Sequence, residues 1–203
     1  DSEVILHAYE EYGRDCLRHL RGMFAFALWD RRQQALFLAR DRIGIKPLYY
    51  YFHAGRLIFA SEIKAILRHP DVQRELNHQA LYDYIGFEFV GAPDTMFRHI
   101  FKIPAGHALW FQNGVPEVRR YWELSFAPPP GGITRQDAEE RALELLDQAV
   151  KSHLVSDVPL GVFLSGGLDS SALVAMMRRH ITGPLRTFTI GYPDKSYSEL
   201  DYA

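Results

Sequence analysis

The chain has 203 residues, 47% of them hydrophobic, and a net charge of −2 from 23 basic and 25 acidic residues. This length allows one large domain or two smaller ones with a buried core. The charges are balanced and form no basic stripe, which argues against nucleic acid as a partner. The single cysteine, Cys16, excludes an internal disulfide, and no apolar run reaches the roughly 20 residues that cross a bilayer. We therefore predict a cytoplasmic protein without a membrane partner.

The first 125 residues predict helices and antiparallel hairpins. Apolar residues at helical spacing predict a helix over 2–12 that ends at Gly13. Two further helices are expected at 62–68 and 78–87, capped by Ser61 and Asn77. Paired apolar runs predict hairpins with strands at 23–30 and 35–41, within 46–62 around His53-Ala54-Gly55, and within 106–124 around Asn113-Gly114.

The composition changes at "FAPPPGGIT", residues 126–134, which we interpret as a linker. A long amphipathic helix is expected to begin at Thr134, with Asp137 as a partial imitation of a capping box. An apolar strand (159–165), a glycine-rich turn, a helix (170–180) and another strand (185–192) follow. That order is a βαβ unit and predicts a parallel sheet.

The turn "SGGLDS", residues 165–170, has the properties of a phosphate-binding loop. Its two glycines allow close approach of the backbone, and the helix that follows directs N–H groups at an anion. Ser165, Ser170 and Ser171 add hydroxyl donors. The sequence does not fit the Walker, dinucleotide or nucleophile-elbow patterns, because it has no lysine, no third glycine and Phe163 two residues before Ser165. A glycine-rich turn without a ligand is the alternative.

The motif S-G-G-x-D-S resembles the pyrophosphate loop of ATP pyrophosphatases. With its flanks, "DVPLGVFLSGGLDSSALVA" (157–175) resembles the synthetase domain of glutamine-hydrolysing asparagine synthetases. The resemblance implies that the loop holds the β- and γ-phosphates of ATP, with Asp169 near Mg²⁺ or pyrophosphate. It also implies that Phe163 and Ile190 contact the adenosine, although core packing would explain their side chains equally well. The implied site is Phe163, Ser165, Gly166, Gly167, Leu168, Asp169, Ser170, Ser171 and Ile190.

The first region has a resemblance of its own. "RGMFAFALWD" (21–30), "ARDRIGIKPLYY" (39–50) and "ASEIKAIL" (60–67) are similar to the class II glutaminase domain of the same synthetases. This family has an N-terminal-nucleophile fold, an αββα sandwich. The resemblance implies that Asp1 binds the α-ammonium group of glutamine, a role compatible with capping the first helix.

The family's nucleophile is an N-terminal cysteine, and this sequence starts at Asp1. We interpret Cys16 as an ordinary half-buried thiol, so no catalytic residue is expected among these residues. Arg40, Asp41, Arg42 and Lys46 interrupt an apolar region, and we interpret the Arg-Asp-Arg segment (40–42) as shaping loops near the glutamine pocket rather than as catalytic. A solvated surface ion network is the alternative for them.

Together the resemblances imply an α/β and α+β chain with three parts. Residues 1–125 form the C-terminal part of the glutaminase sandwich, 126–134 the linker, and 135–203 the start of a parallel-sheet, Rossmann-like ATP-pyrophosphatase domain. Because the chain begins without methionine and stops in "YSELDYA", which resembles the start of a helix, we expect it to belong to a longer protein and to be inactive alone.

The implied parent enzyme makes asparagine from aspartate, glutamine and ATP with Mg²⁺, as a possible homodimer. Three alternatives remain open. They are an amidotransferase of the same architecture acting on another carboxylate, a β-lactam-synthetase-like enzyme, and a non-catalytic nucleotide-binding protein.

Overall fold

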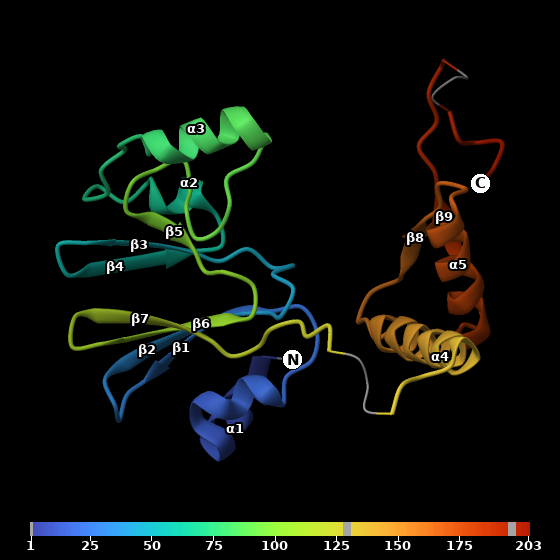
Figure 1. The fold of residues 1–203 in the computed structure, drawn as a ribbon, viewed down its shortest axis with the longest axis horizontal. Helices are drawn as coiled ribbons and strands as arrows, with labels where there is room; N and C mark the ends of the chain where they lie inside the picture. Colours follow the sequence, from blue (N-terminus) through green and yellow to red (C-terminus); the bar gives the residue numbers. More distant parts are fainter. Residues whose placement is uncertain (1, 128–130, 195–197) are drawn as a thin grey trace. The chain divides into compact units, whose positions relative to one another are not determined.

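The computed structural model describes residues 2–127, 131–194 and 198–203 (Figure 1). The chain divides into two compact units, Asp1–Phe126 and Ala127–Ala203, which we call the first and second units. The predicted linker, 126–134, lies partly outside the described residues. The predicted glutamine ligand Asp1 lies wholly outside them.

The first unit contains two antiparallel sheets. Sheet A has the strand order β1-β2-β6-β7 and sheet B the order β4-β3-β5. The strands of sheet A are β1 (Ala25–Asp30), β2 (Ala35–Arg40), β6 (His107–Gln112) and β7 (Val115–Arg120). Those of sheet B are β3 (Tyr49–His53), β4 (Arg56–Ala60) and β5 (Ile100–Lys102). All three predicted hairpins are therefore confirmed.

Helices cover the outer faces of the two sheets (Figure 1). The helical elements of this unit are α1 (Ser2–Tyr12), the 3₁₀ helix η1 (Gly13–Arg18), α2 (Ile63–Ile66) and α3 (His78–Phe87). Alternate residues of β2 face opposite cores: Phe37 packs with the residues of η1, whereas Leu38 packs between the sheets. On sheet B, Tyr51 packs with Ile66 of α2. The layers therefore follow the predicted order α, β, β, α.

The chain crosses between the two sheets twice, and the two crossings are hydrogen-bonded to each other. Residues 41–48 lead from β2 to β3, and residues 103–106 lead from β5 back to β6. The Arg40 guanidinium donates to the carbonyl of Ile103 at 2.8 Å, and the Gly106 N–H donates to the carbonyl of Asp41 at 2.9 Å. Gly106 has a φ of +67°, and a Cβ there would clash with the carbonyl oxygen of Trp122.

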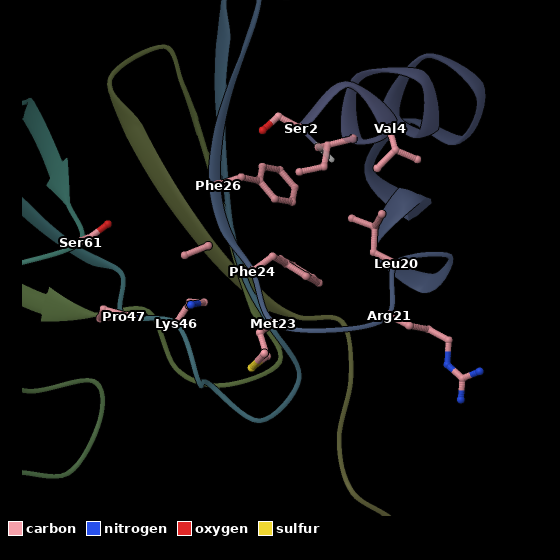
Figure 2. A pocket seen from close by; sticks show the side chains of 12 residues that line it. Ser2, Val4, Leu20, Arg21, Met23, Phe24, Phe26, Lys46, Pro47 and Ser61 are labelled. Carbon is pink, nitrogen blue, oxygen red and sulfur yellow. The ribbon is translucent and has the colours of Figure 1, made fainter. Parts of the chain in front are cut away.

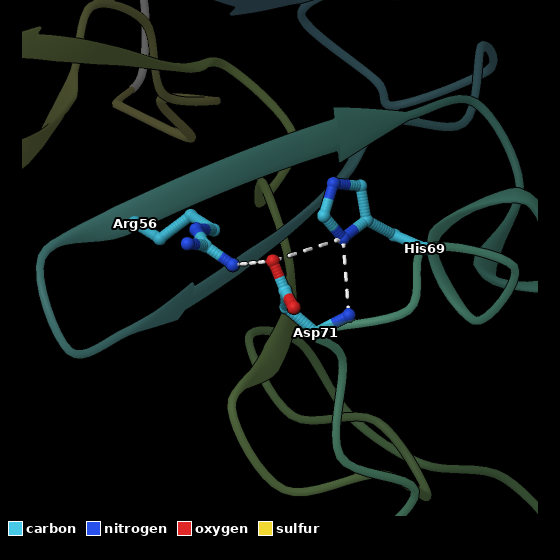
Figure 3. A network of polar contacts seen from close by, with 3 residues as sticks. All are labelled: Arg56, His69 and Asp71. Carbon is cyan, nitrogen blue, oxygen red and sulfur yellow. Dashed lines mark hydrogen bonds and ion pairs between the residues drawn. The ribbon is translucent and has the colours of Figure 1, made fainter.

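Two polar networks attach the outer segments to the sheets. Tyr9 of α1 donates to the Asp30 carboxylate at 2.8 Å, and Asp30 also accepts the N–H groups of Arg32 and Gln33 in the β1–β2 turn. On the other side of the unit, Asp71 pairs with Arg56 of β4 and lies near His69, whose Nδ1 accepts the Asp71 N–H at 3.3 Å (Figure 3). These last three side chains are about half exposed, so the second network contributes little stability.

The second unit begins with α4 (Arg135–His153), followed by β8 (Gly161–Phe163), α5 (Leu168–His180) and β9 (Arg186–Phe188). The predicted cap of α4 is confirmed, since the Thr134 hydroxyl accepts the Asp137 N–H at 3.1 Å. Strands β8 and β9 pair in parallel, which confirms the βαβ prediction. Across the described ranges, every helix is too short or too polar to cross a bilayer.

Several predicted boundaries were wrong. The helix after β4 spans only Ile63–Ile66, with Glu62 rather than Ser61 at its N-cap position. In the second unit the strands are shorter than predicted, and α5 starts at Leu168 instead of Ser170. The start of a helix expected at 197–203 is a turn in its described part, 198–203, where the Tyr202 N–H donates to the carbonyl of Glu199.

Candidate functional site

The predicted phosphate loop connects the end of β8 to the start of α5. The ladder between the strands continues one residue beyond β8, because the Leu164 N–H donates to the carbonyl of Phe188 at 2.9 Å. Gly166 then turns the chain with a φ of +77°, a conformation that residues with a Cβ rarely adopt. Gly167 occupies the N-cap position and returns to an extended backbone. Gly166 thus makes the turn, and Gly167 leads into α5.

Serine hydroxyls brace this loop from within. The hydroxyls of Ser165 and Ser170 lie 3.1 Å apart, and the Ser170 hydroxyl donates to the carbonyl of Gly167 at 3.1 Å. The Ser165 N–H points at the Ser170 hydroxyl at 3.3 Å. These hydroxyls, expected as ligand donors, bond to each other and to the Gly167 carbonyl and hold the turn in shape.

The main chain supplies the groups that suit an anion. The first hydrogen bond within α5 runs from the Ser171 N–H to the carbonyl of Gly167 at 3.0 Å. The N–H groups of Leu168, Asp169 and Ser170 precede it and therefore have no partner within the helix. The positive end of the helix dipole adds to their field. An arrangement of this kind can accept the oxygens of an anion.

Phe163 and Ile190 lie at and just beyond the ends of the adjacent strands β8 and β9. Their side chains are 75% and 64% exposed in the part of the chain that the structure describes. Leu168 is 87% exposed and also lies in the open. Phe163, Leu168 and Ile190 are therefore all exposed near the carboxyl ends of β8 and β9.

The loop offers one carboxylate to a metal ion. Asp169 is its only carboxylate and lies exposed in the first turn of α5. The part of the chain that the structure describes contains no group of three or more histidine, cysteine, aspartate or glutamate side chains able to hold a metal. Mg²⁺ in proteins is commonly held by one or two carboxylates together with substrate phosphates, so one carboxylate here fits an ion that arrives with a nucleotide.

The first unit has a cavity of about 410 Å³ at the start of α1 (Figure 2). In Figure 2, Phe24 and Phe26 lie centrally, with α1 on one side and Lys46 and Ser61 on the other. The cavity is lined by Ser2, Val4, Ile5, Leu20, Arg21, Met23, Phe24, Ala25, Phe26, Lys46, Pro47 and Ser61. Ser61, predicted as a helix cap, thus lines a pocket. The sequence signal for this placement was that Ser61 directly follows an expected strand.

Arg40 and Asp41 build the loop that carries Lys46 to this cavity. Asp41 is 1% exposed, and its carboxylate accepts N–H groups from Ile43, Ile45 and Lys46 at 2.9–3.2 Å. The Arg40 guanidinium donates to the carbonyls of Gly44 and Lys46 as well as to Ile103. Their architectural role is confirmed, and the alternative of a solvated ion network is wrong because both side chains bond to main-chain groups.

These contacts also shift the pKa of Asp41. Burial alone would raise the pKa of this carboxyl, but the N–H groups of residues 43–46 stabilise its charged form. Their combined effect is larger, and the pKa lies below its ordinary value.

Cys16 is completely buried, at 0% exposure, rather than half buried. Burial raises the pKa of its thiol to about 11. Because the thiolate is the reactive form, this sulfur is unsuited to nucleophilic attack at neutral pH.

We therefore expect iodoacetamide at pH 8 to alkylate Cys16 at least about 100-fold more slowly in the native protein than in urea. Mass spectrometry of the tryptic peptide that contains Cys16 measures both rates. Similar rates in the native and unfolded protein would contradict this assignment.

Both parts of the chain match known protein families. Residues 1–122 match the family described as glutamine amidotransferase domain. The chain belongs to this glutamine amidotransferase family. Residues 141–203 of this family member match a second family, described as asparagine synthase.

Curated relatives of this family member cover both units. A glutamine-hydrolyzing asparagine synthetase 3 of Bacillus subtilis is 41% identical over 96% of this chain and 32% of its own length. A putative glutamine-hydrolyzing asparagine synthetase 2 of Methanocaldococcus jannaschii is 39% identical over 100% of this chain and 40% of its own. The chain thus spans about a third of the length of these relatives.

Among solved structures, the match to a glutamine phosphoribosylpyrophosphate amidotransferase from B. subtilis covers 97% of this chain and 41% of that one. The identity is 15% and the TM-score 0.40, a likeness too weak to support an inference about fold.

Proposed function

We propose that these residues work in an ATP-dependent, glutamine-hydrolysing asparagine synthetase. In the proposed reaction, the β-carboxylate of aspartate attacks the α-phosphorus of ATP and displaces pyrophosphate, giving β-aspartyl-AMP. Ammonia released from glutamine then attacks the acyl carbon and displaces AMP. The products are asparagine, AMP, pyrophosphate and glutamate.

The observation that carries this proposal is the loop between β8 and α5. Its free N–H groups at Leu168, Asp169 and Ser170 are suited to the β- and γ-phosphates and to the charge that develops on departing pyrophosphate. Phe163 and Ile190 are exposed beside the loop, where they would contact the adenosine. Asp169 would help to hold Mg²⁺, which would neutralise phosphate charge when bound.

The first unit would contribute to glutamine hydrolysis. The family match and the cavity at the start of α1 support this role. Asp1 precedes Ser2, which lines that cavity, so the predicted contact of Asp1 with the α-ammonium group of glutamine would place the substrate beside it. The inert Cys16 supports a nucleophile that lies elsewhere in the protein.

The test is to incubate the full-length protein with ATP, Mg²⁺ and glutamine, and to measure pyrophosphate and amino acids. We expect pyrophosphate release that requires aspartate, with one asparagine formed per pyrophosphate. Release that requires a different carboxylate would replace aspartate with that acceptor. Absence of release with every carboxylate tried would overturn the enzymatic proposal in favour of a nucleotide-binding module.

A further inference from the structure

The first unit has another cavity, between η1 and β7, with a volume of about 330 Å³. None of its lining residues belongs to the cavity at the start of α1. Trp110, Phe37 and Tyr121 contribute aromatic surface to it, and the arginines come from the two elements at its edges. These are Arg14 and Arg18 of η1, and Arg119 and Arg120 of β7. An arginine-rich cavity with an aromatic wall is typical of binding sites for anions.

Arg14 is the residue that distinguishes this cavity from an ordinary charged surface. The carbon at the centre of its guanidinium lies 3.7 Å from the centroid of the Trp110 ring, a cation–π contact. Within residues 2–127, 131–194 and 198–203, no carboxylate lies within ion-pair distance of Arg14. The Trp110 contact restrains this side chain while leaving its N–H donors without an anionic partner.

The other charges leave the cavity positive. Arg18 pairs with Asp15 at 3.2 Å, and Arg119 pairs with Glu117. Arg120 pairs with Glu123 at 2.6 Å, so Arg14 is the one lining arginine without a carboxylate partner among the described residues. The pairs of Arg18 and Arg119 are largely exposed, so they are held weakly. Since each guanidinium has five donors, both arginines retain donors for another oxyanion.

We propose that this cavity binds a small oxyanion, a carboxylate or a phosphate, through the guanidinium of Arg14 with support from Arg18 and Arg119. The planar guanidinium forms paired hydrogen bonds to two oxygens of either head group. The volume suits a small molecule rather than a polymer. The proposed synthetase reaction assigns no role to the residues that line this cavity.

Isothermal titration calorimetry on the full-length protein tests the proposal, with sodium phosphate and sodium succinate as separate probes at matched ionic strength. We expect at least one of them to bind with a Kd of about 1 mM or tighter. The probe that binds identifies the head group. R14Q should weaken binding about 10-fold, because a charge-assisted contact is lost. R68Q is the matched control, an exposed arginine outside the cavity, and should leave the Kd unchanged.

Arginine labelling separates this cavity from the phosphate loop, since residues 165–171 contain no arginine. Phenylglyoxal labelling followed by peptide mapping should show protection of Arg14 and Arg119 by the bound probe, with Arg68 unprotected. Binding that is equal in the wild type and R14Q, unprotected Arg14, or no binding of either probe at 20-fold the expected Kd of about 1 mM would each overturn the proposal.

Discussion

Replacing Asp41 with asparagine is expected to lower the free energy of unfolding of the first unit by about 3 kcal/mol. One carboxylate oxygen accepts the N–H groups of Ile43 and Ile45, and the other accepts that of Lys46. An asparagine amide has one oxygen, so its NH₂ group would face a buried N–H donor. The substitution leaves that donor unsatisfied where water has little access, because Asp41 is 1% exposed.

Urea unfolding followed by tryptophan fluorescence measures this effect. The three tryptophans of the sequence, Trp29, Trp110 and Trp122, all belong to the first unit, so their emission reports on it. D15N is the control, since Asp15 is exposed and paired with Arg18; we expect less than about 1 kcal/mol from it. Equal unfolding midpoints for D41N and D15N would show that the hydrogen bonds of Asp41 stabilise the first unit no more than an exposed ion pair does.

The same variant has a defined pH dependence. The pKa of Asp41 is lower in the folded protein than its ordinary value, so ionisation stabilises the fold. That stabilisation is complete above the unfolded pKa of about 4 and is lost as the pH falls through the folded value. The difference between wild type and D41N should therefore shrink below pH 4.

Replacing Gly166 with alanine is expected to reduce ATP-dependent pyrophosphate release by the full-length protein by about 100-fold, given the proposed function. Alanine at a φ of +77° costs about 1–2 kcal/mol, and its Cβ would also clash with Tyr202. The chain relieves this strain by moving the loop, which displaces the N–H groups at the start of α5 from the phosphates.

G167A is the matched control within the same loop. Gly167 has a φ of −69°, and a Cβ there would meet the Ser165 hydroxyl at 3.3 Å, so a small adjustment accommodates it. Circular dichroism should show the same helix content for both variants. If G167A lost as much activity as G166A, the backbone conformation of Gly166 would not be the cause.

Local sequence patterns predicted the elements whose geometry is local. The β6–β7 hairpin follows from Asn113 and Gly114, both of which have positive φ, at 53° and 78°. Thr134 and Asn77 cap their helices as expected. Boundaries set by tertiary contacts were predicted less well. The short helix α2 has no side-chain cap, and only Ile66 of it is buried, so local periodicity overestimated its length.

The two candidate sites also differed in how far local sequence could predict them. The phosphate loop lies within seven residues, 165–171, and its conformation follows from adjacent glycines before a helix. The cavity at the start of α1 combines residues from 2 to 61, which no local pattern connects. The burial of Asp41 was also beyond sequence reasoning. An Arg-Asp-Arg run is ordinarily a solvated turn, and only the surrounding carbonyl and N–H groups make it an interior anchor.

The hydrogen-bonded crossings between the two sheets have a consequence for how the first unit comes apart. Arg40 and Ile103 are 63 residues apart in the sequence, yet each crossing completes the hydrogen bonds of the other. If one sheet opens, the hydrogen bonds between the two crossing segments break. Each donor or acceptor left without a partner then raises the free energy. Neither sheet is then a separate foldon, and the slowest-exchanging amides of both should open together in one cooperative event.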